Sequence, residues 1–313
     1  MADLAKVAVV GAGLIGRSWA IVFARAGHEV ALFDADAEVL AQARGRIEHS
    51  LRDLRTFKLI KKVKPILRRV CVTARLGDAL SGAKHAQESI FEELEAKRAI
   101  FGEMDALAAG DCVLASSSSY IPASRITENL RGRVRCLIAH PANPPHVIPI
   151  VEIVPAAWTD ADTVARTRAL FAAAGQVPIV VRRELDGFVL NRLQAALLNE
   201  AARLVEAGYV DAHDLDKTIS AGLGRRWAFM GPFETIDLNA PGGVADYARR
   251  YGPSMYEMAR QQADPRPWSD ALVAQIDAER RKVLPLSQHR ARQEWRDRNL
   301  MRISQAINDR DER

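Results

Sequence analysis

The feature that most constrains the fold is a glycine-rich turn near the N-terminus, set between two short apolar runs. Residues 6–10 (KVAVV) form the first run and end at Gly11, and residues 14–26 then carry apolar side chains at helical spacing. The second run, residues 29–33 (EVALF), ends at Asp34. A strand, a helix and a strand in so short a segment predict two parallel strands joined by a crossover helix.

The turn has the pattern of a dinucleotide-binding site. Residues 11–16 (GAGLIG) fit G-x-G-x-x-G. In that motif the first glycine permits a tight turn, the second lets a pyrophosphate approach the backbone, and the third lets the helix pack on the strand. The helix N-terminus then presents N–H groups to the pyrophosphate. We therefore predict that the cofactor is bound by Gly11, Gly13, Leu14, Ile15 and Gly16.

Asp34 predicts which dinucleotide binds. A carboxylate at the end of the second strand can accept hydrogen bonds from the adenosine ribose hydroxyls, and it would repel a 2′-phosphate. The next residue, Ala35, supplies no cation for such a phosphate. The sequence therefore favours NAD over NADP.

Alternation of strand-like and helix-like segments predicts the fold class of the first part of the chain. Strand candidates lie at residues 85–90, 112–115, 134–139, 149–154 and 177–181, with helical segments between several of them. This pattern predicts a doubly wound Rossmann-type α/β domain. After Gly187 the segments look helical, without a convincing strand. We therefore expect an NAD-binding domain at residues 1–186 and an all-α substrate and dimerisation domain at residues 187–313.

Polar side chains follow two of these strand candidates. The serines 116–119 come after one apolar run and His140 after the next, so both lie at the sheet edge where open α/β sheets bind ligands. Glu152 lies inside a further apolar run, where an unpaired carboxylate is costly. We expect Glu152 to pair with His140, which would orient the imidazole and raise its basicity.

Six segments, in order along the chain, resemble the 3-hydroxyacyl-CoA dehydrogenase superfamily. They are GAGLIGRSWA, ASSSS, AHPANPP, PIVEIVP, GFVLNRLQ and GLGRRWAFMGPFET. Within that superfamily they look most like the lambda-crystallin / L-gulonate 3-dehydrogenase branch, and the resemblance covers roughly residues 5–252.

The resemblance implies roles for individual residues. His140 matches the general acid/base and Glu152 its partner, while Ser119 and Asn191 match residues that hold the substrate oxygen. Ser117, on the same turn as Ser119, is expected to contact the substrate as well. The positions that the resemblance assigns to the cofactor are Glu92, Lys97 and Asn143.

The implied reaction is an NAD-dependent oxidation of the 3-hydroxyl of a hydroxy acid. His140 removes the hydroxyl proton while a hydride passes from the same carbon to the nicotinamide. Positioning and base catalysis are the protein's share, and the redox chemistry belongs to the cofactor. The alternative of a non-enzymatic, crystallin-like structural protein is disfavoured, because such a protein has no need of a carboxylate in a buried strand.

The substrate is predicted from Arg225 and Arg226, because an arginine can bind a carboxylate through two hydrogen bonds. We expect a small free hydroxy acid, with L-gulonate or a related sugar acid first. An ion pair at the surface or between subunits is the alternative use of each arginine. Residues 44–75 carry eleven Lys or Arg and two acids, so they offer either a solvated helical face or a contact for the phosphates of a 3-hydroxyacyl-CoA. L-Carnitine is the third candidate, and its quaternary ammonium would require an aromatic cage.

Other classes of function lack support in the sequence. The net charge is +5 without a nucleic-acid recognition motif, and no signal peptide or long apolar span is evident. The three cysteines are far apart and lack metal-ligand spacing. We therefore expect a cytoplasmic protein that uses no metal and binds neither nucleic acid nor membrane. The resemblance further implies a homodimer.

Overall fold

The computed structural model describes residues 5–263 and 265–311, which form two compact units. The first unit comprises residues 5–192 together with Asp297–Ala306, and the second contains Leu193–Arg296 and the residues from Ile307 onward. The division after Arg192 lies downstream of the boundary expected at residue 186. The return of Asp297–Ala306 to the first unit is a feature that the sequence did not indicate.

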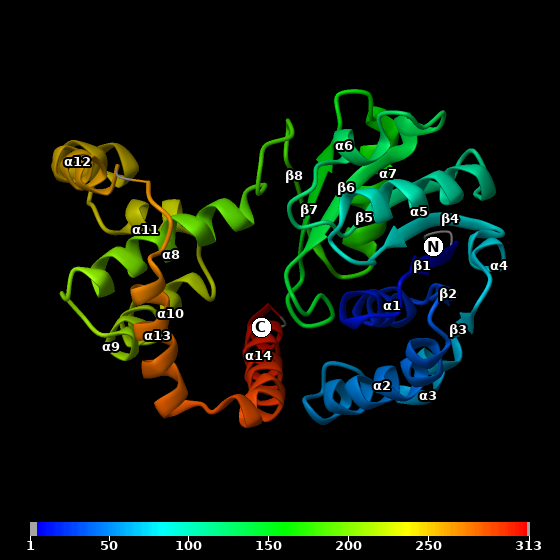
Figure 1. Ribbon diagram of the computed structural model, residues 1–313, viewed down its shortest axis with the longest axis horizontal. Coiled ribbons are helices and arrows are strands. Elements are labelled where there is room, and N and C mark those ends of the chain that lie inside the picture. The colour runs from blue at the N-terminus through cyan, green and yellow to red at the C-terminus, as the bar shows by residue number, and fades with distance from the viewer. Residues whose placement is uncertain (1–4, 264, 312–313) are drawn as a thin grey trace. The chain divides into compact units, whose positions relative to one another are not determined.

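One sheet runs through the first unit, with the strand order β3-β2-β1-β4-β5-β6-β7-β8 within the described residues (Figure 1). Its first six strands have the order 3-2-1-4-5-6 of a Rossmann dinucleotide-binding sheet and are parallel. The predicted doubly wound α/β domain is therefore confirmed. The strands are β1 (Lys6–Val10), β2 (Val30–Phe33), β3 (Val70–Thr73), β4 (Ala83–Glu88), β5 (Val113–Ser116), β6 (Cys136–Pro141), β7 (Ile150–Pro155) and β8 (Val177–Val180).

Two strands depart from a simple parallel reading of the sequence. β3 is a strand at the end of the basic stretch that the sequence analysis treated as helical. β7 is antiparallel to β6. The connection between Pro141 and Ile150 is shorter than the dozen or so residues that a crossover requires, so the chain turns back beside β6.

Helices cover both faces of the sheet, and the alternation of side chains along each strand supplies both cores. Val7 and Val9 belong to one buried cluster, and Ala8 and Val10 belong to the other. The first cluster includes side chains from α1 (Leu14–Ala26), α2 (Ala37–Thr56), α3 (Val63–Arg68) and α7 (Ala161–Ala173). The second includes side chains from α4 (Leu76–Leu80), α5 (Leu94–Leu107) and α6 (Ala123–Thr127).

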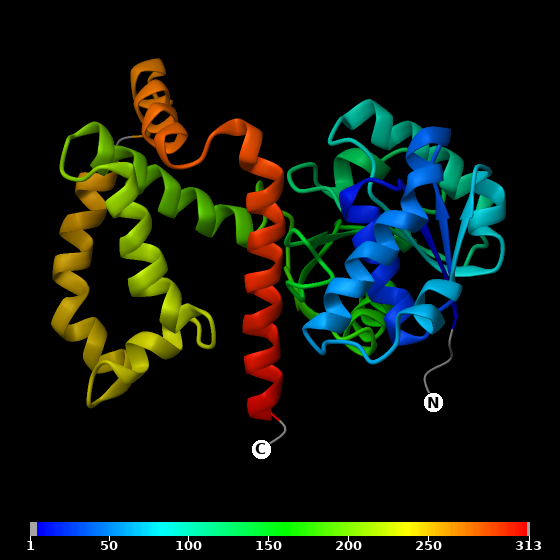
Figure 2. The same ribbon diagram turned by 90° about the horizontal axis from the view of Figure 1, so that it is seen from below.

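The last helix, α14 (His289–Asp311), is the long red helix of Figure 2. Its residue Met301 is buried in the first of these clusters. Ser304 Oγ lies 3.4 Å from the carbonyl oxygen of Val147, and the Arg302 guanidinium lies 5.5 Å from the centre of the Phe57 ring. The middle of α14 is therefore part of the α/β unit's own packing.

The described residues of the second unit form helices joined by turns and contain no strand, which confirms the predicted all-α class. Its helices are α8 (Leu190–Glu206), α9 (Ala212–Lys217), a π-helical turn (Thr218–Leu223), α10 (Gly224–Trp227), α11 (Pro232–Leu238), α12 (Gly243–Gln262) and α13 (Asp270–Val283). Ala202, Val205 and Leu272 form its small buried core. Among the helices of residues 5–263 and 265–311, none combines the length and apolarity that crossing a bilayer requires.

Candidate active site

The glycine turn has the geometry that a bound pyrophosphate requires. Gly11 has φ of 101°, and a Cβ on Gly16 would lie 1.8 Å from the carbonyl oxygen of Gly11, so neither position accepts a side chain without rearrangement. At Gly13, by contrast, an added Cβ would meet no atom within 4 Å. No acidic residue lies in the first turn of α1 and no side chain caps it, so its N–H groups are available to an anion.

Asp34 is fixed to the same turn. Its Oδ2 accepts a hydrogen bond from the Ala12 N–H at 2.6 Å, and its Oδ1 accepts one from the Asp36 N–H at 2.9 Å. Each oxygen keeps lone-pair capacity for a ribose hydroxyl. Together with the open helix N-terminus, this arrangement fits the adenosine and pyrophosphate of NAD.

Arg17 is a residue of this region that the sequence analysis missed. Its Nη1 donates to the Ala12 carbonyl at 2.6 Å, and burial followed by the charge of Arg46 lowers its pKa, against the opposing effect of Asp34. The sequence signal was its position directly after Gly16. The charges of Arg46 and Asp34 both act on Arg17, so two cations lie near Asp34. The residue that directly follows Asp34 is uncharged.

His140 and Glu152 are register partners across the antiparallel pair β6 and β7. His140 Nδ1 lies 2.8 Å from Glu152 Oε2, and both side chains are buried. Because a carboxylate accepts, Nδ1 carries the hydrogen, and in the neutral form of the imidazole Nε2 holds the lone pair. Within the described residues, Nε2 has no protein partner.

The second oxygen of Glu152 anchors the start of α8. Oε1 accepts hydrogen bonds from the Val189 and Leu190 N–H groups at 2.9 and 3.0 Å. Burial raises the pKa of Glu152, but the hydrogen bonds from His140, Leu190 and Val189 outweigh it and hold that pKa below its ordinary value. The carboxylate therefore stays ionised beside the imidazole near neutral pH.

The helix that Glu152 anchors delivers Asn191 to the serine turn, the segment of residues 116–119 at the end of β5. Asn191 Nδ2 donates to the Ser119 carbonyl at 2.8 Å. The Ser119 hydroxyl itself forms no hydrogen bond with any residue that the structure describes. A continuous chain of contacts thus runs from His140 through Glu152 and α8 to Ser119.

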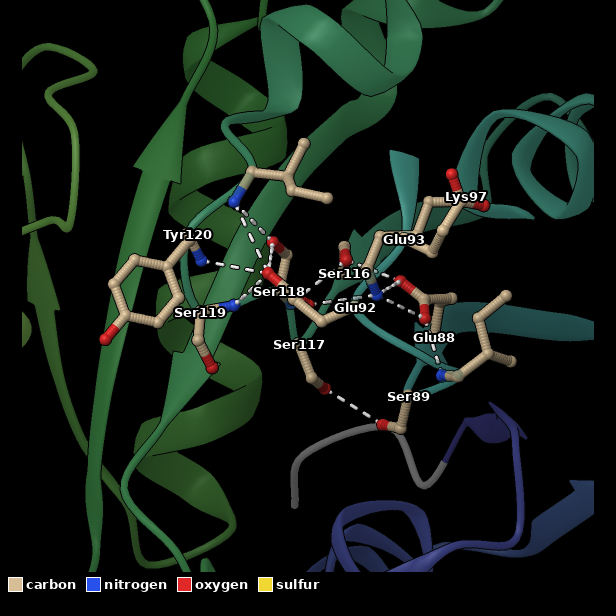
Figure 3. Close-up of polar contacts among 12 residues, drawn as sticks. Glu88, Ser89, Glu92, Glu93, Lys97, Ser116, Ser117, Ser118, Ser119 and Tyr120 are labelled. Carbon is tan, nitrogen blue, oxygen red and sulfur yellow. Dashed lines mark hydrogen bonds and ion pairs between the residues drawn. The ribbon is translucent and has the colours of Figure 1, made fainter. Parts of the chain in front are cut away.

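The Ser117 hydroxyl, which was expected to contact the substrate, is held by partners within the protein. Its Oγ accepts from Trp19 Nε1 at 3.0 Å and from Gln87 Nε2 at 2.8 Å. It also lies 2.9 Å from Ser89 Oγ, the contact drawn in Figure 3. A hydroxyl has one donor and two acceptor sites, so these three partners use all of them. The Ser117 hydroxyl is therefore a structural link within the protein, and the substrate contact expected for it stays a prediction.

Glu92 holds the serine turn from the other side (Figure 3). Its Oε1 accepts from Ser118 Oγ at 2.6 Å and from the N–H groups of Ser119 and Tyr120, both at 2.9 Å. Burial raises the pKa of Glu92, yet these hydrogen bonds and the Lys97 ammonium keep that pKa below its ordinary value. Glu92 therefore fixes the backbone of the turn as an ionised carboxylate.

Lys97 and Glu88 form a buried ion pair behind this turn. Their side chains are 1% and 0% exposed, and Lys97 Nζ lies 2.9 and 3.1 Å from the two carboxylate oxygens of Glu88. Glu88 was not among the residues expected at the site. The sequence carries no signal for it of the kind used for Glu152, because β4 (AKHAQE) contains Lys84, His85 and Gln87 and is not an apolar run.

The remaining predicted site residues are exposed. Asn143 lies on the connection between β6 and β7, in a cis peptide bond with Pro144. Arg225 and Arg226 lie on α10 of the second unit, whereas all the contacts above belong to the first unit.

Comparisons with known proteins match both parts of the chain to one family. The model of the 3-hydroxyacyl-CoA dehydrogenase NAD-binding domain matches residues 6–185, and that of the C-terminal domain of the same family matches residues 187–282. The lambda-crystallin of Oryctolagus cuniculus is 40% identical over 95% of this chain and 95% of its own length. The L-carnitine dehydrogenase of Streptomyces coelicolor is 34% identical over 88% of this chain and 84% of its own.

The solved structures that resemble the chain include a match over nearly its whole length. It is an NAD⁺-dependent dismutase, 5-formyl-3-hydroxy-2-methylpyridine 4-carboxylic acid 5-dehydrogenase, with a TM-score of 0.85 and 26% identity over 98% of this chain and 99% of that one.

Proposed function

The chain belongs to the 3-hydroxyacyl-CoA dehydrogenase family, and on that premise we propose that it oxidises the 3-hydroxyl of a small free hydroxy acid, first of all L-gulonate or a related sugar acid. Family membership makes the protein an NAD-dependent oxidoreductase that acts on a CH–OH group. The observation that carries the proposed chemistry is the buried His140–Glu152 pair, whose free Nε2 is the base that the reaction requires.

The proposed step moves one proton and one hydride. His140 Nε2 takes the hydroxyl proton, and the imidazolium that forms is stabilised by the ionised Glu152 at Nδ1. The Ser119 hydroxyl, which has no partner among the described residues, donates to the substrate oxygen, and Asn191 holds the Ser119 backbone. The hydride leaves the same carbon, and NAD, when bound, supplies the acceptor.

The choice of a free acid rests on the second unit and on the relatives. Arg225 and Arg226 are exposed on α10 and form no ion pair with any described residue, which leaves both able to bind a carboxylate. L-Carnitine and the pyridine carboxylic acid named for two of the relatives are both free acids. The motifs themselves are most similar to the L-gulonate 3-dehydrogenase branch.

Two other substrates are supported by specific observations. A 3-hydroxyacyl-CoA is the substrate class in the name of the family, and the basic residues of α2 and α3 would suit its phosphates. L-Carnitine is supported by a relative's name and by exposed aromatic side chains near α10, Trp227 and Phe233. A purely structural role, as in a lens crystallin, would leave the His140–Glu152 pair without a purpose.

A substrate panel at fixed NAD⁺ tests the proposal. We expect L-gulonate to give a higher kcat/KM than 3-hydroxybutyrate, L-carnitine or 3-hydroxybutyryl-CoA, measured by NADH formation. The variant His140→Ala should lower kcat by about 10²- to 10⁴-fold and leave NAD⁺ binding unchanged. His49→Ala, at an exposed histidine of α2, is the matched control.

Two outcomes would contradict the proposal in different ways. Normal turnover by His140→Ala would remove the catalytic assignment. A higher kcat/KM for the CoA thioester would keep the chemistry and overturn the choice of a free acid.

We also propose a cytoplasmic homodimer. Large apolar side chains are exposed on the second unit, among them Leu193, Phe233, Leu238 and Tyr256, and a partner surface would cover them. The three free cysteines are consistent with a reducing compartment. A monomer mass by light scattering would contradict the dimer.

A further inference from the structure

Glu88 has no role in the chemistry proposed above, yet it lies at the centre of the polar network behind the serine turn (Figure 3). Both of its oxygens accept from Lys97 Nζ, Oε2 also accepts from Ser116 Oγ at 2.5 Å, and Oε1 accepts from the Ile90 N–H at 2.6 Å. A buried carboxylate and a buried ammonium are each costly, and removing one partner leaves the other unpaired.

Lys97 lies between two carboxylates and is shared unequally. Its Nζ is 2.9 Å from Glu88 Oε1 but 3.5 Å from Glu92 Oε2. Because Glu88 makes the closer pair, Glu92 remains free to direct Oε1 at the amides of Ser119 and Tyr120.

Ser116 provides a second link from Glu88 to the turn. Its hydroxyl donates to Glu88 Oε2 and accepts a hydrogen bond from the Ser118 N–H at 3.1 Å. Glu88 therefore acts on the turn both through Lys97 and Glu92 and through the Ser116 hydroxyl.

We propose that Glu88 is a positioning residue for the serine turn: it holds Lys97 and Ser116 in place, so that Glu92 stays on the turn amides and Ser119 stays in register with Asn191. The link to catalysis rests on the proposed function of Ser119. The link between Glu88 and the conformation of the turn does not depend on it.

The charges of Glu88, Lys97 and Glu92 predict how variants of this cluster behave. Glu88→Gln keeps the size of the side chain but leaves the buried Lys97 with Glu92 as its nearest carboxylate, so Glu92 is drawn from the turn. In the double variant Glu88→Gln/Lys97→Met neither buried charge remains, and Glu92 is free to return to the amides. Damage by the single variant and recovery in the double variant is the signature of positioning through Lys97.

Amide hydrogen exchange of the full chain measures the turn without requiring activity. We expect exchange at Ser119 and Tyr120 to be about tenfold faster or more in Glu88→Gln, because each amide loses a hydrogen bond to a charged acceptor. The double variant should return toward the wild-type rate. Glu95→Gln, at a side chain 71% exposed near the start of α5, is the matched control and should match the wild type.

Kinetics on the active substrate form the second readout. We expect kcat/KM to fall about tenfold in Glu88→Gln and to recover in the double variant. Ser116→Ala keeps all three charges and removes only the second link, so it should raise exchange of the Ser118 amide. If Glu88→Gln does not fold, Ser116→Ala and the double variant test the positioning role.

Three results would overturn the proposal: unchanged turn exchange in Glu88→Gln, unchanged exchange in Ser116→Ala, or a double variant that exchanges no slower than the single one. If the exchange pattern holds while no hydroxy acid of the panel is oxidised, the proposed function fails and the positioning role stands.

Discussion

Glu152 divides its two carboxylate oxygens between a side chain and a helix. One oxygen receives the His140 Nδ1–H, and the other receives two N–H groups at the start of α8. Three hydrogen bonds compensate for the loss of water around a fully buried charge. The same carboxylate thus orients the imidazole and fixes the helix that carries Asn191.

The serine turn carries two different hydroxyls, that of Ser117 with protein partners and that of Ser119 without a described one. This difference is testable. Ser117→Ala leaves Trp19 Nε1 without an acceptor and leaves Gln87 Nε2 with only the Ala139 carbonyl, so it should lower the free energy of unfolding by about 1–3 kcal/mol. Ser119→Ala removes a hydroxyl without a described partner, so stability should be unchanged while kcat/KM falls about 10- to 100-fold. Urea unfolding and steady-state kinetics on both variants measure the contrast. The reverse pattern would show that the two roles are exchanged.

The sequence predicted individual residues well where one local argument sufficed. Glu152 was paired with His140 because a carboxylate in an apolar strand needs a partner, and the structure shows that contact. The same argument does not reach Glu88, because its strand carries Lys84, His85 and Gln87 and does not look like a buried apolar run in the sequence. Ser117 could not be resolved in this way, because its partners Trp19 and Gln87 come from separate elements that only the fold brings together.

At the scale of elements, the direction of β7 decides the geometry of the site. Antiparallel pairing places the start of β7 beside the end of β6, so Glu152 stands opposite His140. In a parallel pair the start of β7 would lie at the other edge of the sheet. The direction was predictable from the short connection, whereas β3 was obscured because it directly follows a basic helical segment.

The glycine turn gives a prediction about packing of strand against helix. Gly16→Ala places a Cβ 1.8 Å from the Gly11 carbonyl oxygen, so it should cost about 3 kcal/mol or more and abolish NAD⁺ binding. Gly45→Ala lies inside α2 with no atom within 4 Å of the new Cβ, so it should stabilise the protein by about 0.5–1 kcal/mol. Urea unfolding and NAD⁺ titration compare the two. A Gly16→Ala protein that binds NAD⁺ normally would contradict the assigned turn.

At the scale of the whole molecule, two buried histidines predict that the free energy of unfolding depends on pH in the acid range. Burial lowers the pKa of His85 and of His146 from the ordinary 6.5 to about 4. Between about pH 4 and pH 6.5 these two imidazoles bind protons in the unfolded chain but not in the native one. The free energy of unfolding therefore falls as pH is lowered from about 6.5 to about 4, and this contribution levels off below that range.

The size of the loss should be on the order of 3 kcal/mol for each histidine. Urea unfolding at several pH values across this window measures it. The variant His85→Leu should remove roughly half of the pH dependence that the two histidines cause, whereas His49→Ala, at an exposed position, should leave it unchanged. An unaltered pH dependence in His85→Leu would show that this imidazole has the same pKa in the native and the unfolded protein.

The two-unit organisation was predictable, but the return of the last helix was not. A change from alternating segments to purely helical ones marks a boundary in the sequence, and helical periodicity shows that a helix has an apolar side. It does not show which unit that side joins. Met301 belongs to the core formed by residues that precede it by more than a hundred positions.

This placement of Met301 bears on the order in which the protein is made. During synthesis the strands and helices of the α/β unit leave the ribosome first, and the helices of the second unit follow. The first core keeps an unfilled position until the segment that carries Met301 emerges. The nucleotide-binding unit, although encoded first, is therefore among the last parts of the molecule to complete its packing.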